Sequence, residues 1–398
     1  MDSMKEDPGF NAVTAALAGM AALVVAMGIG RFAFTPLLPL MQAETGLSLA
    51  GGGWMAGANY LGYLVGALAA TRIAAAPAGM LALGLTAVVL TTAAMGPVSS
   101  FDGWMVIRFA AGVASAWALV GAAALCLGRL REAGRPRLAG VMFAGVGIGI
   151  ALAGLACQAV VFAGGGAVAG WWVLAALAAV LAVPAVRGLS PGPGAPATQG
   201  TRPAAQGFDA RDARRLVWSY GLLGFGYILP ATFLPAQARM LVGDPAVFGW
   251  VWPVFGAAAA ASMWIAVGRR HGGLSRRARW AGSQAVMAVG VLLPALHDSL
   301  AALAVSALCV GGTFMVVTML ALQEGAAVGG ARAQPLIASM TAAFAGGQLL
   351  GPLVAAGLEL GGQGMDPALM LAAAALAVGA VLPVSGRRET MHATEESR

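Results

Sequence analysis

The chain has 398 residues, of which 59% are hydrophobic and only 10% are charged, and its mean hydropathy is +0.82. Soluble domains carry roughly 25% charged residues, so this composition excludes a water-soluble protein and indicates that lipid surrounds most of the chain. The net charge of +7 does not indicate a nucleic-acid-binding protein, because the basic residues stand in short breaks between apolar runs.

Twelve apolar runs approach the length of about 20 residues that a helix needs to cross a bilayer core of about 30 Å. The acidic segment 1–11 lacks the positive region of a secretory signal, so we expect the first run to remain as a membrane helix. A first set of spans is predicted at 12–40, 49–70, 78–95, 103–128, 138–162 and 171–187. A second set is predicted at 216–237, 248–268, 280–296, 300–321, 336–358 and 367–384, followed by a tail, 385–398. The long first span is expected to tilt or bend at Pro36 and Pro39.

Basic residues gather on one side of this arrangement. When the spans alternate in direction, 20 of the 23 Lys and Arg residues fall on the face that holds both termini. Only Arg239 falls on the opposite face, and Arg31 and Arg108 fall inside spans. Because Lys and Arg accumulate in cytoplasmic loops, we expect a multi-pass protein of a bacterial inner (plasma) membrane with both termini in the cytoplasm.

The two sets of spans are predicted to form two halves, 12–187 and 216–384. Between them, segment 188–215 is rich in Pro, Gly, Ser and Thr, which is typical of a solvated cytoplasmic linker. The halves match at a shift of 196 residues, which pairs Gly28 with Gly224, Gly30 with Gly226, Leu38 with Leu234 and Pro39 with Pro235. Duplicated halves are typical of secondary transporters that bind their cargo between the repeats, near the bilayer midplane.

The runs GIGRFAFTPLLPLM (28–41) and GANYLGYLVGALAATR (57–72) carry a family resemblance. Together they resemble an uncharacterised bacterial subfamily of the major facilitator superfamily, the YbfB/YjiJ-like group. Arg108-x-x-x-Gly112 and the run GVGIGIALAG (145–154) are similar to the superfamily's fourth- and fifth-helix patterns. The acidic residue that usually follows the second helix is missing, since Ala70 and Thr71 stand there.

The resemblance implies an all-α membrane protein of the major facilitator fold, with twelve transmembrane helices in two pseudo-symmetric six-helix halves. It also implies transport by alternating access, with spans 2, 5, 8 and 11 forming the seam between the halves. The sequence suits that seam, because small residues let helices approach closely in lipid. These residues are Gly62 and Gly66, the glycines of 145–154, the alanines of 257–261, and Gly347 and Gly351.

Arg31 and Arg108 are the candidate cargo-binding residues. A membrane-centred arginine costs about 2.5–3.5 kcal/mol on insertion scales, yet no acidic residue lies in the central part of any span, since Glu324 and Glu359 stand at span ends. A guanidinium binds carboxylate or phosphate through two parallel hydrogen bonds, so we expect the cargo to supply the counter-ion and to be a small organic anion. The alternative is structural: pairing with helix carbonyls for Arg31, or snorkelling to the interface for Arg108.

Further polar and aromatic candidates for the cargo site lie on predicted cavity faces. They are Asn59 and Tyr63 in span 2, Trp117 in span 4, Tyr220 and Tyr227 in span 7, and Gln348 in span 11. For the aromatic residues, packing or interface anchoring is the alternative. Asn59 and Gln348 are stronger candidates than the aromatic residues, because an unpaired amide in hydrocarbon is costly.

Other classes of function find less support in the sequence. Cys126, Cys157 and Cys309 stand singly, and His271, His297 and His392 stand in loops or the tail, so we expect no metal, no cofactor and no proton relay through a buried carboxylate or imidazole. No ATP-binding GxxxxGK[ST] sequence and no nucleophile–base pair is present. We expect a monomeric transporter rather than an enzyme, with an efflux carrier for drugs or metabolites, built around an apolar pocket, as the alternative.

Overall fold

The computed structural model describes residues 11–70, 76–189, 209–268 and 273–395, and within them every regular element is a helix. The N-terminal segment 1–11 and the linker 188–215 therefore lie largely outside the described residues. The first elements are α1 (Ala12–Leu23), the π-helix η1 (Val24–Ile29), α2 (Phe34–Thr45), α3 (Leu49–Ala70), α4 (Pro77–Ala94), α5 (Phe101–Glu132), the 3₁₀ helix η2 (Pro136–Leu138), α6 (Ala139–Phe162) and α7 (Ala167–Leu189). The later ones are α8 (Ala210–Leu241), α9 (Pro245–Phe248), α10 (Val251–Gly268), α11 (Arg276–Leu296), α12 (Leu300–Gly329), the 3₁₀ helix η3 (Gly330–Arg332), α13 (Ala333–Leu360) and α14 (Asp366–Glu395).

Ten segments of the described chain are long and apolar enough to cross a membrane. The expected spans 49–70 and 280–296 form helices α3 and α11 but are not among the ten. Their hydropathy is lowered by particular residues: Asn59, tyrosines and many glycines in α3, and arginines and Gln284 in α11. The all-helical membrane architecture is confirmed, while the count of twelve spans stays a prediction.

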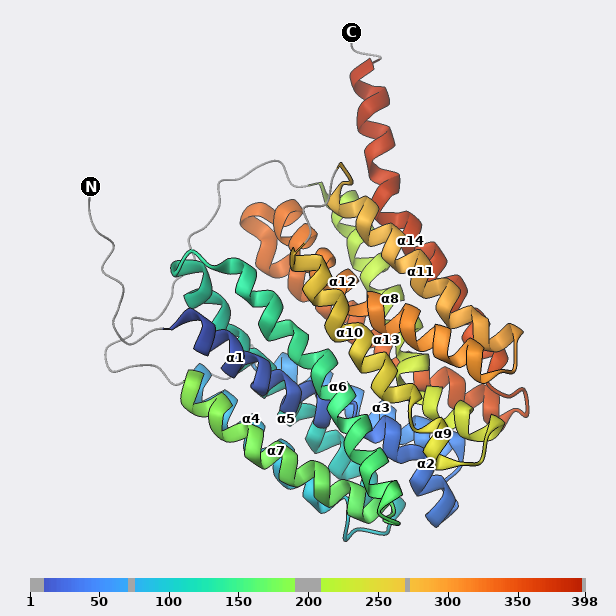
Figure 1. Ribbon diagram of the computed structural model, residues 1–398. Helices are drawn as coiled ribbons and strands as arrows, with labels where there is room; N and C mark the ends of the chain where they lie inside the picture. Colours follow the sequence, from blue (N-terminus) through green and yellow to red (C-terminus); the bar gives the residue numbers. More distant parts are fainter. Residues whose placement is uncertain (1–10, 71–75, 190–208, 269–272, 396–398) are drawn as a thin grey trace.

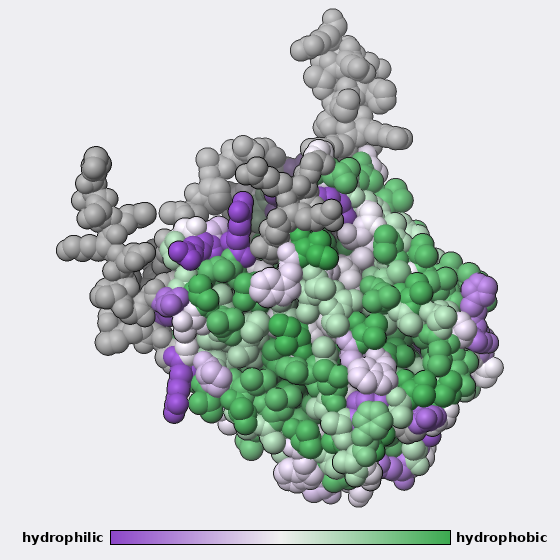
Figure 2. Space-filling view, in the orientation of Figure 1, coloured by the Kyte–Doolittle hydropathy of each residue, from purple (hydrophilic) through white to green (hydrophobic). Residues whose placement is uncertain are grey.

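The flank of the bundle is apolar, as a lipid-facing surface requires. Figure 2 shows hydrophobic side chains covering the middle of the visible face, with hydrophilic ones gathered towards its ends. Large apolar side chains are exposed along the helices, including Leu90, Val106 and Val180 at 62%, 68% and 69%. An apolar surface of this extent belongs in contact with a membrane rather than with water.

The helices pack in two groups. Helices α1 to α7 contact one another, as do α8 and α10 to α14, and the groups meet where α3 packs on α13, α6 on α10 and α2 on α8. The helices run along a common direction, and α1 begins and α14 ends at the same end of the bundle, here named the termini end (Figure 1). The opposite end, where α2 ends and α3 begins, is named the far end.

One hydrogen bond joins two equivalent positions of the repeat, one in each group of helices. The Thr35 hydroxyl donates to the carbonyl of Ala231 at 2.8 Å, and these two positions are 196 residues apart. That separation equals the shift at which the two halves of the sequence match. Two equivalent positions can touch only near an axis that relates the groups, so the contact supports an internal two-fold repeat.

The first predicted span is interrupted earlier than its prolines. It forms α1, then the π-helix η1, then a hydrogen-bonded turn over 30–33, and α2 resumes at Phe34. Pro36 lies in the first turn of α2, where no intrahelical donor is needed. The expected tilt or bend at Pro36 and Pro39 stays a prediction. The break in the helix falls earlier, at the glycine-rich segment before them, and π-bulges are a recognised cause of kinks.

Candidate functional site

The glycines of the first span allow its broken segment to lie against neighbouring helices. A Cβ on Gly28 would be 2.4 Å from the Cα of Gly149 on α6, and a Cβ on Gly30 would be 2.4 Å from the Ser115 hydroxyl on α5. Both distances are too short for any side chain. The glycine pattern before Arg31 therefore allows the broken helix to sit deep among α5 and α6.

The break leaves backbone carbonyls that two side chains bind. The amide of Asn59 on α3 donates to the carbonyls of Gly30, at 3.3 Å, and Arg108, at 3.0 Å. The guanidinium of Arg108 on α5 donates to the carbonyl of Arg31 at 3.1 Å. Irregular backbone at membrane depth is tolerated only when its polar groups are satisfied by the protein. Asn59 and Arg108 thus brace the irregular segment that carries Arg31.

Arg31 projects into a shell of aromatic rings. Its side chain is 2% exposed, and its guanidinium carbon lies 4.0 Å from the ring centre of Tyr63, 5.2 Å from Tyr60 and 5.5 Å from Phe32. Its terminal nitrogen donates to the Gln348 side-chain oxygen at 3.0 Å, whereas its Nε has no hydrogen-bond partner among the described residues. Ring faces attract a cation by about 2 kcal/mol when it is desolvated, but they do not neutralise it.

The two membrane arginines have different surroundings. Arg108 is equally buried, but its terminal nitrogen is bound to backbone and its guanidinium lies 4.8 Å from the ring centre of Phe34. The sequence leaves carbonyl pairing open for Arg31 and snorkelling for Arg108, whereas in the structure it is the buried Arg108 that binds a carbonyl. Among the described residues, neither arginine forms an ion pair. Arg31, whose guanidinium binds a side-chain amide rather than backbone, is the better candidate for contact with cargo.

Gln348 connects Arg31 to the second group of helices. Its amide nitrogen is hydrogen-bonded to the Tyr227 hydroxyl, and its oxygen receives the Arg31 donor. Tyr227 is stacked between Phe314 and Phe344, with ring centres 5.5 Å from each. One polar chain therefore runs from α13 to both the broken first span and α8. The structure brings together three residues selected from the sequence, Arg31, Gln348 and Tyr227.

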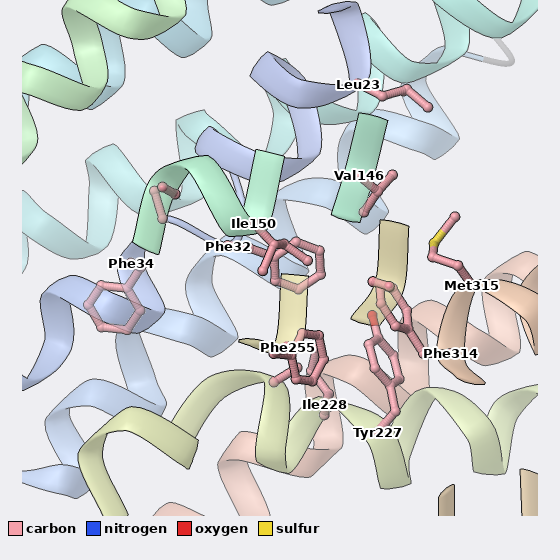
Figure 3. Packing of buried hydrophobic residues seen from close by; sticks show 14 of the residues in the cluster. Leu23, Phe32, Phe34, Val146, Ile150, Tyr227, Ile228, Phe255, Phe314 and Met315 are labelled. Atoms are coloured by element: carbon pink, nitrogen blue, oxygen red, sulfur yellow. The ribbon is translucent and has the colours of Figure 1, made fainter. Parts of the chain in front are cut away.

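A row of aromatic side chains extends from this polar chain. Phe314 lies 5.7 Å from Phe255, and Phe255 lies 4.9 Å from Trp252. Trp252 in turn lies 6.4 Å from Phe32 beside Arg31. Figure 3 shows Tyr227 alongside Phe314, with Phe255 close to Ile228. Sequence reasoning missed Trp252, Phe255, Phe314 and Phe344, because single aromatic residues in apolar runs look like ordinary packing.

The remaining sequence candidates lie further from Arg31. Tyr220 is stacked on Phe344 at 4.7 Å and so joins the aromatic row through that ring. Trp117 donates from its indole nitrogen to the carbonyl of Gly66 at 3.1 Å and packs α5 against α3. No cluster of metal-ligating side chains lies in the part of the chain that the structure describes.

Comparison with known proteins identifies the family. A family model described as "Uncharacterised MFS-type transporter YbfB", MFS being the major facilitator superfamily, matches residues 23–384. The chain belongs to this family. The protein is therefore a membrane transporter and not an enzyme, and the family resemblance of the sequence is confirmed. No curated protein sequence matches the chain.

Two solved structures share the major facilitator fold of this chain. A mutant of the nucleoside transporter NupG is 15% identical, with a TM-score of 0.67 over 93% of this chain and 98% of that chain. The human organic anion transporter MFSD10 is 16% identical, with a TM-score of 0.64 over 92% of this chain and 99% of that chain. At these identities the similarity establishes the fold alone.

In this MFS transporter the small residues of spans 2 and 11 do not pack where the sequence suggests. A Cβ on Gly62 would be 2.0 Å from the Phe109 carbonyl oxygen on α5, and a Cβ on Gly347 would be 2.3 Å from the Gly221 carbonyl oxygen on α8. These glycines join helices within one group. At the seam it is Gly53 that faces α13, since a Cβ on Gly53 would be 3.0 Å from the Pro352 carbonyl oxygen. The expected seam role of these two motifs is wrong, because each helix has several neighbours and a small-residue pattern does not say which one it faces.

The glycines of α6 do lie at the seam. A Cβ on Gly147 would be 2.3 Å from the backbone nitrogen of Ala260, and one on Gly154 would be 2.5 Å from the Pro253 side chain. From the other side, a Cβ on Gly256 would be 2.2 Å from the backbone of Ala151. The expected close packing of spans 5 and 8 is therefore confirmed.

A cluster of charged side chains ties the second group together at the termini end. Arg277 on α11 contacts Asp212 on α8 and Glu324 on α12, each at 2.6 Å, and the three side chains are only 12–15% exposed. The hydrogen bonds that the Arg277 guanidinium donates, first to Asp212 and then to Glu324, raise its pKa against the opposing effect of burial. The acidic residue at the end of span 10 is thus engaged with arginines far from Arg31.

Proposed function

We propose that this protein is a secondary transporter that moves a small organic anion by alternating access between two six-helix halves, 12–187 and 216–384. The observation that carries the proposal is Arg31. Its charge is buried at the junction of the two groups, no carboxylate of the described chain pairs with it, and its Nε has no partner.

The contacts of Arg31 suit an anion that exchanges with an amide. Gln348 offers one neutral oxygen to the guanidinium, whereas a carboxylate offers two charged oxygens in the geometry of a parallel pair of hydrogen bonds. An arriving anion would replace a weaker acceptor and neutralise the buried charge. Because Gln348 also holds Tyr227, the exchange would change the link between the two groups of helices, which couples binding to movement.

The conformation supports closure at the far end. Here Tyr60 is hydrogen-bonded to Thr232 at 3.0 Å, and the Gln158 amide donates to the carbonyl of Ala246 at 2.9 Å. With the Thr35–Ala231 bond, these contacts join the two groups from the level of Arg31 towards the far end. We infer that the cargo path opens next at the termini end, which the charge asymmetry of the sequence assigns to the cytoplasm.

Among the residues that the structure describes, no carboxylate or imidazole pairs with Arg31 to couple transport to protons. The carboxylate and imidazole residues that commonly relay protons stand in loops, at span ends or in the tail. Three modes of transport remain compatible with this composition: anion exchange, facilitated diffusion, and transport of a proton together with the cargo.

A second candidate function is efflux of apolar drugs or metabolites, and the aromatic row favours it. In the second group a continuous row of contacting rings is formed by Trp252, Phe255, Phe314, Tyr227 and Phe344. The two structural neighbours do not select between the candidates, because one is named for nucleosides and the other for organic anions.

The test compares anion transport by reconstituted wild-type protein with Arg31→Gln and Arg31→Lys, after a screen of metabolites for thermal stabilisation, since ligands of the native state raise its melting temperature. Losing a buried charge-assisted pair costs about 2–5 kcal/mol, so Arg31→Gln is expected to weaken anion binding roughly 30-fold or more. Arg31→Lys keeps the positive charge but loses the forked pair of guanidinium donors. Its affinity for the anion is expected to lie between those of the wild type and Arg31→Gln. Arg135→Gln removes an exposed arginine and is the control. Unchanged anion transport by Arg31→Gln would refute the proposal, and binding of neutral apolar compounds alone would favour efflux.

A further inference from the structure

A cleft lies between α8 and α13 at the termini end, away from Arg31. Its volume is about 420 Å³, and its polar lining consists of Arg214, Arg332 and Ser339. Val217 and Leu336 contribute apolar side chains to its wall. The cleft belongs to neither the polar chain nor the aromatic row described above.

The cleft exists because two tightly packed helices separate at their ends. From Gly221 onwards α8 and α13 are in close contact: a Cβ on Gly221 would be 3.3 Å from the Ala343 side chain, and one on Gly224 would be 2.2 Å from the carbonyl oxygen of Phe344. The cleft residues, 210–217 and 332–339, precede these contact points on both helices. The opening is therefore wedge-shaped, with its narrow end towards the membrane interior.

Polar and apolar groups are layered along this wedge. Arg214 and Arg332 precede the expected spans, which begin at 216 and 336, whereas Val217 and Leu336 lie at the start of those spans. Trp218, the next residue on α8, is 67% exposed, as is typical of tryptophans at the membrane interface. The arginines thus lie at headgroup depth and the apolar wall at the depth where acyl chains begin.

We propose that this cleft binds the headgroup of an anionic phospholipid from the leaflet at the termini end. Two guanidinium groups offer forked donors to a phosphate, and basic clefts between membrane helices recognise anionic headgroups in this way. A free phosphate would use the arginines but leave the apolar wall uncovered, whereas a lipid covers both. The inference does not depend on the identity of the cargo. It has a consequence for the site, because α8 and α13 also carry Tyr227 and Gln348.

The experiment measures lipid binding to the purified full-length chain. Detergent-solubilised protein is titrated with phosphatidylglycerol or with phosphatidylcholine of the same acyl chains, and retained lipid is counted by native mass spectrometry alongside the melting temperature. The variant is Arg214→Gln combined with Arg332→Gln. The control is Arg135→Gln combined with Arg137→Gln, which removes the same charge from exposed positions of the first group.

The proposal expects retention of phosphatidylglycerol over phosphatidylcholine, with the preference reduced at least tenfold in the cleft variant and kept in the control. Equal loss in both variants would mean attraction to net charge and would overturn the proposal. Stabilisation by inorganic phosphate equal to that by phosphatidylglycerol would also overturn it, by assigning the cleft to a soluble anion. If the cleft variant fails to fold, Val217→Asp supplies the second test at a partly exposed wall position, since a charged wall is expected to abolish lipid retention but not phosphate binding.

Discussion

Adjacent glycines on α13 offer a sharp test of how the second group is packed. Gly347→Ala would place a methyl group 2.3 Å from the carbonyl oxygen of Gly221 and 2.6 Å from the backbone nitrogen of Phe225. Neither atom belongs to a side chain that can rotate away. Gly346→Ala, one residue earlier, would place its methyl group in open space, with nothing within 4 Å.

The expected difference follows from these distances. Ordinary contact begins near 3.4 Å, so Gly347→Ala must push α13 from α8 by about 1 Å, and such overpacking costs about 1–3 kcal/mol or more. Gly346→Ala meets no obstacle and gains about 0.5–1 kcal/mol, because alanine is the better helix former. The two variants are expected to differ at least tenfold in the ratio of folded to unfolded protein.

The assay is thermal unfolding of both variants in one detergent, followed by tryptophan fluorescence, with anion transport measured in parallel. Gly347→Ala is expected to lower the melting temperature and to impair transport, since it displaces the neighbouring Gln348 from Arg31. Gly346→Ala is expected to do neither. Equal losses in the two variants, or no loss in either, would refute the assigned packing of α13 on α8.

Two further predictions concern polar side chains. Asn59→Ala is expected to destabilise the protein by about 1–3 kcal/mol, because the buried carbonyls of Gly30 in the broken span and of Arg108 on α5 lose their donor; unchanged thermal stability would contradict this. Arg277→Gln is expected to cost about 1.5–3 kcal/mol, since its hydrogen bonds reach charged, largely buried partners. The control, Arg276→Gln, removes a side chain that is 40% exposed and is expected to cost at most about 1 kcal/mol. Chemical unfolding measures the free energy of unfolding of both variants. Equal losses of stability in the two would contradict this prediction.

The membrane architecture and the position of Arg31 could be predicted from the sequence, because both depend on where charge stands relative to apolar runs. The linear sequence alone shows that Arg31 stands in an apolar run that contains no acidic residue near it. Its partner Gln348 was also visible as an isolated amide in an apolar helix. What the sequence did not reveal is that the two meet, 317 residues apart.

Other features escaped prediction for physical reasons. The bracing role of Arg108 depends on carbonyls that only the break in the first span makes available. The seam role of Gly62 and Gly347 was wrong, because small residues favour close approach to any neighbour. The aromatic row is assembled from four helices, α8, α10, α12 and α13, so no local sequence pattern predicts it. Phe255 does stand 196 residues after Asn59, at the equivalent position of the repeat.

Because the first span is interrupted, the two equivalent helices of the repeat are expected to differ in flexibility. Its counterpart α8 continues as one helix from Ala210 to Leu241 and includes Pro230 and Pro235, so one copy is interrupted while the other is continuous. Bending the first span requires only that the hydrogen bonds from Asn59 and Arg108 rearrange. The continuous helix α8 is expected to move mainly by tilting as a unit. Motion during a transport cycle would therefore be concentrated at the residues flanking Arg31, and hydrogen exchange should be faster at 24–33 than at the corresponding residues 220–229.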